Sequence, residues 1–338
     1  MRALALMMLV GCAVEPVTDS ETDDLKLGGS ACSDWMCGTN SPVMDGLGFH
    51  HLYTLPYGKP EEHGFGITAM QLSNGHQATL RVIDGKMQAT DLTSPYPVIK
   101  NSGLESSHIT LHNYATNTDY DLEIEKVSNA GYWAKPLNGT HPNLEAYQIL
   151  WKHSAIRESY QYLCPNTITA SDGMGLYTYL AVVYEGDFLD AVNKVDRYVD
   201  TGQFNLGCAG STVSKLALTG HTLAAIQDGF STTIDERTTM IKMLSADYCG
   251  NGTPFTVAGE PLYWADDKGT MNPLGSGVTE AMWTKDGAAC LDTPRIEAHP
   301  ALPSKFLKVD DTLDLLDSMC KPPPCTHKGY HLTSINPT

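Results

Sequence analysis

The chain has 338 residues, a length that allows roughly two domains. Its 39 acidic residues outnumber its 22 basic residues and give a net charge of −17. This balance opposes binding to nucleic acid or to anionic lipid head groups, because both attract clusters of lysine and arginine.

The first twelve residues have the order of a lipoprotein signal. Met1 and Arg2 are followed by an apolar run at 3–10 and then by Gly11-Cys12. We expect residues 1–11 to be a signal peptide and Cys12 to carry a lipid that ties the protein to a membrane. The alternative is a chance cysteine, since the leader is shorter than the usual ~15–30 residues. Alanine at position 13, where some bacteria use aspartate to retain lipoproteins at the inner membrane, favours the outer one.

Residues 12–31 are acidic and poor in large apolar side chains, so we expect a flexible tether. No later stretch has the ~20 consecutive apolar residues that a membrane-spanning helix needs. We therefore expect the body of the protein to be soluble and to lie outside the cytoplasm, tied to the cell envelope through Cys12.

Residues 32–152 show short strands and turns. Polar and apolar residues alternate at 108–112 and at 120–125, which is the pattern of a strand with one buried face. Residues 78–83 and 86–89 flank Asp84-Gly85, a typical hairpin turn. Residues 146–151 form another candidate strand. The pattern predicts a β-rich N-terminal module.

Residues 153–300 mix strands with a helical pair. A strand at 180–184 is followed by a helical rhythm at 210–225, weakened by Gly220, and by a second helix at 235–246. Gly250 suits the turn that ends the second helix. Further strands are expected at 281–283 and 288–290. Residues 301–338 are expected to be a C-terminal tail with a local disulfide, and the part after residue 318, which contains three consecutive prolines, is expected to be loosely ordered.

Cysteine usage supports an oxidising compartment. The chain has nine cysteines, and setting Cys12 aside leaves an even number for disulfides. If the two helices pack antiparallel, Cys208 and Cys249 come together, and short loops could close two further pairs. We therefore expect disulfides among Cys32–Cys37, Cys208–Cys249, Cys320–Cys325 and Cys164–Cys290.

Several motifs in the second half resemble those of the ADYC domain family, found mainly in secreted proteins and lipoproteins of myxobacteria and their relatives. The name comes from Ala246, Asp247, Tyr248 and Cys249. The other matching segments are FNLGCAG at 204–210, FT at 255–256, EAMW at 280–283, GAAC at 287–290 and PR at 294–295. The segments CGTNSP at 37–42 and GFH at 48–50 resemble the N-terminal part of such proteins. The resemblance implies an architecture and an exported location, and it carries over no catalytic residue.

Two residues are candidates for catalysis. A thiol at Cys208, just before a helix N-terminus, would be stabilised as a thiolate and could be a nucleophile. Asp247 could be an acid, a base or a cation ligand. The structural alternatives are a disulfide for Cys208 and, for Asp247, backbone hydrogen bonds with Arg237 or Arg295 nearby. The structural alternatives are favoured.

Metal binding is a further alternative. Cys32 and Cys37 with His50 and His51 could hold zinc, and residues 61–63 with the same histidines could form another site. Thiolates in an oxidising space usually pair with each other, and residues 61–63 also fit a solvated loop. We therefore expect no metal ion and no cofactor.

Together these features predict an α+β protein, in which a β-rich N-terminal module precedes a disulfide-stabilised domain of short strands with a helical pair. We expect a lipid-anchored, non-enzymatic protein that binds a partner protein or an envelope ligand. The alternative is an extracytoplasmic hydrolase centred on Cys208 or Asp247. A concave pocket with two or more titratable groups within hydrogen-bond reach would favour the enzyme.

Overall fold

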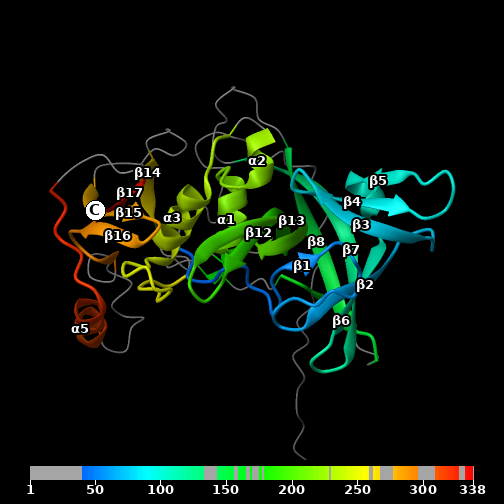
Figure 1. Ribbon diagram of the computed structural model, residues 1–338, viewed down its shortest axis with the longest axis horizontal. Coiled ribbons are helices and arrows are strands. Elements are labelled where there is room, and N and C mark those ends of the chain that lie inside the picture. Colours follow the sequence, from blue (N-terminus) through cyan, green and yellow to red (C-terminus); the bar gives the residue numbers. More distant parts are fainter. Residues whose placement is uncertain are drawn as a thin grey trace, which may run out of the picture.

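The structure is a computed structural model, and it describes residues 40–132, 143–155, 159–164, 168–169, 175–176, 179–227, 230–258, 262–266, 277–295, 309–326 and 332–337. A large sheet occupies one side of the molecule and a small sheet the other, with helices between them (Figure 1). Cys12, Cys32 and Cys37 lie outside the described residues, as do the expected signal peptide and tether.

The large sheet is antiparallel throughout, with strands in the order β1-β13-β12-β8-β7-β6-β2-β3-β4-β5 and β9 paired to β8. Its strands are β1 (Leu52–Tyr53), β2 (Phe65–Gln71), β3 (Gln77–Ile83), β4 (Lys86–Asp91), β5 (Val98–Lys100), β6 (Ser107–Asn113), β7 (Thr118–Gly131), β8 (Asn143–His153), β9 (Gln161–Tyr162), β12 (Leu180–Asp190) and β13 (Val195–Cys208). A 3-10 helix, η2 (Asn101–Leu104), precedes β6, and β10 (Ile168–Thr169) pairs with β11 (Gly175–Leu176).

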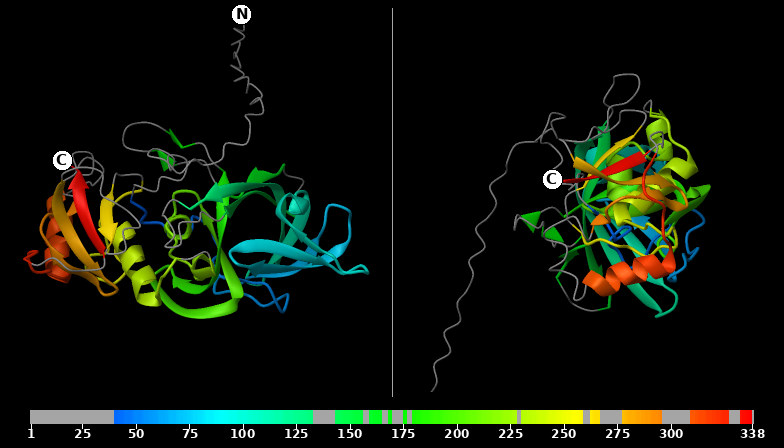
Figure 2. Two further views of the ribbon diagram at one scale, coloured as in Figure 1. Left: turned by 90° about the horizontal axis from the view of Figure 1, so that it is seen from above. Right: turned by 90° about the vertical axis from the view of Figure 1, so that its left-hand side faces the viewer.

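The large sheet curls on itself around an apolar interior (Figure 2). Two hydrogen bonds link strands that are not neighbours in the sheet order. The amide of Met87 donates to the Tyr147 hydroxyl at 2.8 Å, and the amide of Gly85 donates to Glu185 Oε2 at 2.8 Å. These bonds hold the β3–β4 hairpin over β8 and β12, which encloses one face of the sheet.

A second core lies where the helices meet both sheets. Helix α1 (Thr212–Leu218) is capped by Ser211, whose side chain accepts from the Ser214 amide, and α2 (Leu223–Gln227) follows it. The expected helix at 210–225 is interrupted at Gly220, which has a φ of +77° and lies against the Phe230 ring. A Cβ there would come within 2.3 Å of that ring, so only glycine fits.

Helix α3 (Ile234–Ser245) confirms the second expected helix within one residue at each end. Thr233 and Glu236 form a capping box at its start. Ala246, in the left-handed conformation, ends it. The helix contacts β13 of the large sheet and β15 of the small one.

The small sheet has the order β14-β17-β15-β16, with β14 (Tyr263–Asp266), β15 (Gly277–Thr284), β16 (Gly287–Leu291) and β17 (Leu332–Pro337). Helix α5 (Val309–Met319) packs Leu313 and Leu316 against the second core. The expectation of a loosely ordered tail after residue 318 is wrong for β17, which is a strand of the small sheet. β17, which comes from this region, lies between β14 and β15 and pairs with both.

The predicted fold class is confirmed: strands predominate and helices are few. The expected boundary at 152/153 is not a boundary of the sheet, since it falls inside β8 and β8 pairs with β12. None of the described helices has the length and apolar character needed to cross a membrane.

Candidate functional site

The four residues Ala246, Asp247, Tyr248 and Cys249 join the end of α3 to the small sheet. Asp247 is fully buried; its Oδ2 accepts from Lys242 Nζ at 2.6 Å and from the amide of Gly252 at 2.7 Å, and its Oδ1 accepts from the Asn251 amide. We expected Arg237 or Arg295 to supply its donors, but Lys242 and the backbone do so. Every described contact of Asp247 thus secures the turn after α3.

Tyr248 lies in a buried network with Glu280 and Arg295. Its hydroxyl donates to Glu280 Oε1 at 2.6 Å and accepts from the Arg295 amide at 2.8 Å. Arg295 Nε reaches both Glu280 oxygens at 3.0 Å. Burial, reinforced by the Glu280 charge, raises the pKa of Tyr248 well above its usual range. The phenol therefore stays protonated and holds the small sheet to α3.

Three disulfides join described cysteines: Cys164–Cys208, Cys249–Cys320 and Cys290–Cys325. The expected pairs Cys208–Cys249, Cys320–Cys325 and Cys164–Cys290 are wrong. Cys208 is the last residue of β13 and pairs in register with Ala181. Its position in the large sheet, and not the helix that follows it, therefore determines which cysteine it meets. Disulfides of this number are typical of proteins outside the cytoplasm, and the chain is accordingly an extracytoplasmic protein.

Cys208 has no free thiol in this structure, because it is bonded to Cys164. A thiolate nucleophile at this position would require reduction of the disulfide first. Neither Cys208 nor Asp247 lines either of the two cavities described below. Both candidate catalytic residues therefore stabilise the fold, Cys208 through a disulfide and Asp247 through hydrogen bonds.

The first cavity lies inside the curl of the large sheet and has a volume of about 480 Å³. The chain before β1 covers it with residues 46–49, while β2, β6, β7, β8 and β9 supply its walls. Among the described residues that line it, none is charged. They are Gly46, Leu47, Gly48, Phe49, Phe65, Leu111, Tyr120, Leu122, Trp151, Gln161, Tyr162 and Leu163. The size lies within the range of small-molecule sites.

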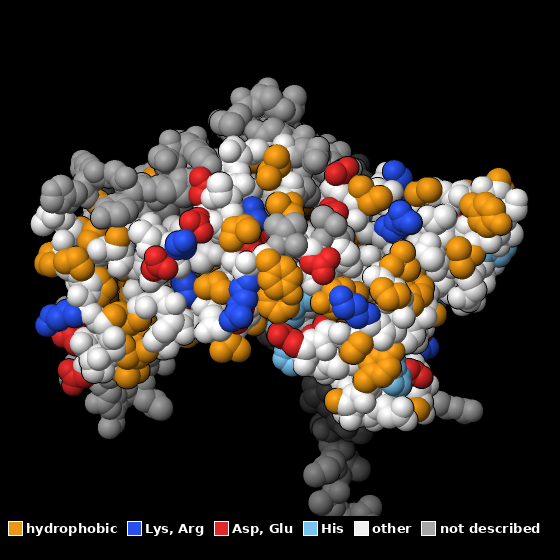
Figure 3. Space-filling view, in the orientation of Figure 1, with side chains coloured by type: hydrophobic (Ala, Val, Ile, Leu, Met, Phe, Trp, Pro, Cys, Tyr) orange, Lys and Arg blue, Asp and Glu red, His pale blue; other side chains and the backbone are white. Residues whose placement is uncertain are grey.

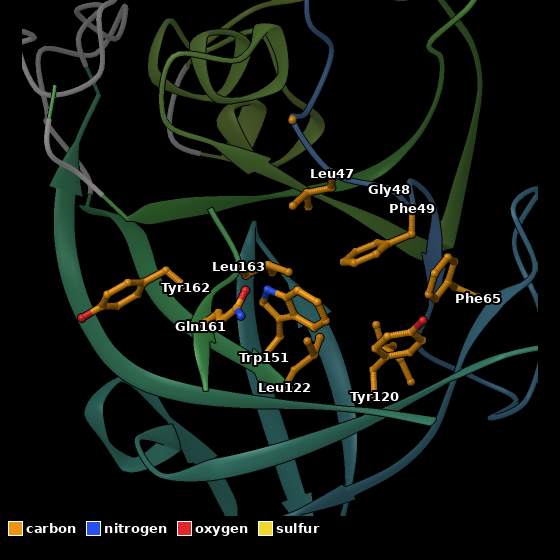
Figure 4. A pocket seen from close by; sticks show the side chains of 12 residues that line it. Leu47, Gly48, Phe49, Phe65, Tyr120, Leu122, Trp151, Gln161, Tyr162 and Leu163 are labelled. Atoms are coloured by element: carbon orange, nitrogen blue, oxygen red, sulfur yellow. The ribbon is translucent and has the colours of Figure 1, made fainter. Parts of the chain in front are cut away.

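Four aromatic rings follow one another along this cavity. Ring centroids are 5.6 Å apart for Phe49 and Phe65, 5.8 Å for Phe65 and Tyr120, and 6.0 Å for Tyr120 and Trp151. Figure 4 shows Phe49, Phe65 and Tyr120 grouped at one end, with Leu47 above Trp151. The Tyr162 ring points away from this group. The arrangement forms a continuous apolar surface, which we call the aromatic pocket.

The second cavity, of about 490 Å³, lies on the other face of the same strands. Side chains alternate between the two faces, so that Leu111, Tyr120, Leu122 and Trp151 line the aromatic pocket. Their sequence neighbours Thr110, Asp121 and Lys152 line the second cavity, together with Ala69, Gln71, Gln77, His108, Ser154 and Tyr160. We call this second cavity the polar pocket.

Asp121 is the centre of the polar pocket. Its Oδ1 lies 3.0 Å from His108 Nδ1, and its Oδ2 accepts from the Tyr160 hydroxyl at 2.5 Å and lies 3.6 Å from Lys152 Nζ. The hydrogen bond with Tyr160 raises the pKa of Lys152, and burial raises the pKa of Tyr160. Both shifts move the pKa further above 7, so Lys152 and Tyr160 each keep their proton at pH 7. Neither is therefore prepared to act as a base or nucleophile at that pH. His108 and Asp121, which lie 3.0 Å apart, are the other two titratable side chains that line this pocket.

Of the adjacent histidines His50 and His51, only His50 lies close to the described residues 61–63. His50 lies with Glu62 and His63. His51 is buried elsewhere, with Nε2 2.9 Å from the Leu189 carbonyl and its ring stacked on Phe188 at 4.0 Å. Burial lowers the pKa of His51, so it stays neutral at pH 7.

The fold and its sites define an extracytoplasmic, disulfide-bonded β-rich protein with two cavities on opposite faces of one sheet. A family comparison then places the chain: the ADYC domain matches residues 101–297, and the protein belongs to the ADYC domain family. The match begins before β6 and so includes strands that we expected in a separate N-terminal module. Searches of curated proteins and of solved structures gave no significant match.

Sequence reasoning missed the aromatic pocket, although part of its signal is local. The alternation at 108–112 and 120–125 predicts one apolar face, which includes Leu111, Tyr120 and Leu122. Phe49, Phe65 and Trp151 come from three other segments, and only the curl of the sheet brings them to that face. The polar pocket follows from the same alternation read on the opposite face.

Proposed function

We propose that the protein is a lipid-anchored binding protein of the cell envelope, which takes an uncharged apolar group into the aromatic pocket. The anchor would be Cys12, which lies outside the described residues, and Ala13 after it favours the outer membrane. The net charge of −17 argues against nucleic acid as a partner.

The continuous row of Phe49, Phe65, Tyr120 and Trp151 is the observation that carries this proposal. Aromatic faces give a large apolar contact area with little conformational freedom to lose, which favours flat rings and acyl chains. The absence of charge among the described lining residues disfavours ionic ligands, since a buried charge without a partner is costly. A partner protein could supply the same chemistry through a single apolar side chain.

The test uses the neutral fluorescent probe N-phenyl-1-naphthylamine, titrated into the purified mature protein. We expect saturable binding with one site. Trp151→Ala should weaken it about tenfold or more, because loss of one stacked ring removes on the order of 1 kcal/mol beyond the lost area.

Because Trp151→Ala removes a large packed side chain, a second variant fills the pocket instead of emptying it. A Cβ added at Gly48 meets no atom within 4 Å, and Gly48 lines the pocket. Gly48→Leu should therefore leave the thermal unfolding midpoint unchanged while it lowers probe affinity. Tyr96→Ala removes an exposed aromatic residue outside the pocket and is the matched control. Equal affinities in all four proteins would contradict the proposal.

The polar pocket supports a second candidate function, hydrolysis with His108 as a general base. Asp121 Oδ1 lies 3.0 Å from His108 Nδ1, which would orient the ring and leave Nε2 to take a proton from water. This moves the hydrolase alternative from Cys208 and Asp247 to a cavity with several titratable groups in hydrogen-bond reach.

Hydrolysis of p-nitrophenyl acetate tests this second function. His108→Ala and Asp121→Asn should each lower the rate by about 10²-fold or more if His108 is the base. The control is His112→Ala, because His112 pairs with Asp119 at 2.7 Å on the same two strands but lies outside the pocket. Equal rates in the parent protein and in all three variants would rule this function out for that substrate class.

A further inference from the structure

Three metal-ligating side chains come together at the surface where the chain enters β1 and β2. His50 precedes β1, and Glu62 and His63 precede β2; one ligand atom from each lies within 4.8 Å of those from the other two. The rings of His50 and His63 are 4.7 Å apart, edge to face. We propose that these residues bind a divalent transition-metal ion of the zinc type, contrary to our expectation of no metal.

Each histidine is held by a buried carboxylate that is not itself one of the three ligands. His50 Nδ1 is hydrogen-bonded to Asp45 Oδ2, and His63 Nδ1 lies 3.1 Å from Glu61 Oε2. Pairing at Nδ1 leaves Nε2 of each ring as the nitrogen available for a cation. Carboxylates in this outer position typically orient metal-binding histidines and raise their basicity.

Glu61 also fixes the loop that carries His63. Its Oε1 accepts from the amides of His63 and Phe65 at 2.9 and 3.0 Å, and its side chain is fully buried. On the other segment, Asp45 Oδ1 accepts from the Leu47 amide at 2.9 Å, and its backbone carbonyl accepts from the Cys208 amide at 2.9 Å. Both ligand-bearing segments are therefore set in place before any ion arrives.

Charge and access favour a cation at this site. Asp45, Glu61 and Glu62 contribute three negative charges against two imidazoles. The side chains of His63 and Glu62 are 47% and 44% exposed, so an ion can reach them from solvent. Figure 3 shows histidine and acidic side chains next to one another at the surface below β1. The rest of that face mixes acidic, basic and apolar side chains.

The ligand set indicates the class of ion. Two imidazoles and one carboxylate suit zinc and neighbouring transition metals, whereas calcium and magnesium prefer oxygen ligands alone. Three protein ligands leave a tetrahedral zinc ion one further position for a water molecule. The site would thus join two segments at the rim of the aromatic pocket. One is the segment before β1, which contains Phe49, and the other is the loop before Phe65.

The proposal is independent of the ligand that the aromatic pocket takes, and its test does not use the fluorescent probe. Full-length mature protein, freed of metal by chelation, is titrated with zinc chloride by calorimetry, and its zinc content is measured after gel filtration. We expect one zinc ion per chain. His63→Ala and Glu62→Gln, both at exposed positions, should each weaken binding at least tenfold, and Asp45→Asn about 10- to 100-fold. Calcium should not compete.

The controls are His76→Ala and His112→Ala, which remove two other histidines paired with aspartates at 2.8 and 2.7 Å. Their zinc affinity should equal that of the parent protein. Circular dichroism and thermal unfolding of each variant establish that the fold is retained. A stoichiometry below one in the parent protein, or zinc affinity unchanged in both His63→Ala and Glu62→Gln, would overturn the proposal.

Discussion

Two buried carboxylates share one guanidinium between the large sheet and α3. Arg237 Nε lies 2.9 Å from Asp187 Oδ2 and 2.7 Å from Asp196 Oδ2, and all three side chains are almost completely excluded from solvent. Burial first, and then the charge of Asp196, raise the pKa of Asp187 to about 7, although Arg237 acts in the opposite direction. One positive charge does not offset two buried negative ones.

This carboxyl makes stability depend on pH. Because the pKa of Asp187 is higher in the folded than in the unfolded protein, its contribution is complete below about pH 4 and is lost as the pH rises to about 7. We expect the free energy of unfolding in urea to fall over this range. Asp187→Asn mimics the protonated form. It should reduce the decrease in the free energy of unfolding by about 4 kcal/mol, since each pKa unit is worth about 1.4 kcal/mol.

Asp286→Asn is the control for this measurement, because it changes an exposed carboxyl in the β15–β16 turn. Its pH profile should follow that of the parent protein. A parent protein whose unfolding free energy rises between pH 4.5 and 7.5, with the same slope in Asp187→Asn, would show that Asp187 is ionised throughout.

Other features at the residue scale show where sequence reasoning stops. The left-handed Ala246 and the glycine at 250 both belong to the turn after α3, and we expected Gly250 in that role. A Cβ at Gly250 would lie 2.0 Å from the Asp286 carbonyl, so the β15–β16 turn packs directly on it. The residues after α3 predict a turn. Asp286, the neighbour that requires glycine at position 250, lies 36 positions later in the chain.

At the scale of elements, α5 is joined to the rest by a disulfide as well as by packing. Cys320 follows α5 and is bonded to Cys249 beyond the end of α3. Leu316 is buried, while Leu315 and Met319 on the same helix are exposed. In the described part of α5, Leu313 and Leu316 are the side chains that pack against the core, and we therefore expect the helix to depend on its covalent link.

Removing that link should destabilise the protein measurably. The Cys249–Cys320 bond spans 71 positions, and closing a loop of that length in the unfolded chain corresponds to about 4 kcal/mol. We expect the double variant Cys249→Ala/Cys320→Ala to unfold at a clearly lower urea concentration. Native-state hydrogen exchange should show the largest loss of protection in α5. Unchanged protection there would mean that packing alone retains the helix.

The strands were the most predictable elements. Alternation at 108–112 and 120–125 corresponds to β6 and β7, and the Asp84-Gly85 turn joins β3 to β4 as expected. The helix expected at 210–225 was divided by Gly220, because Phe230 occupies the space that a side chain there would need. Local periodicity identifies an element, but a tertiary neighbour can interrupt it.

At the scale of the molecule, the two expected modules share one sheet. β13, which ends at Cys208, pairs with β1, and β8 pairs with β12 across the expected boundary. The family match likewise begins at residue 101, well before that boundary. Composition and turn spacing could not show this, because strands that pair across the chain carry the same alternation as strands of separate sheets.

The sequence by itself determined the fold class, the faces of the strands, the position of α3 and the use of disulfides. Each of these depends on side-chain chemistry repeated over a few neighbouring residues. Only the tertiary structure decided which cysteines pair, which rings line the aromatic pocket and that His50, rather than His51, meets His63. These depend on the curl of the sheet and on contacts between segments far apart in the chain, which no local period encodes.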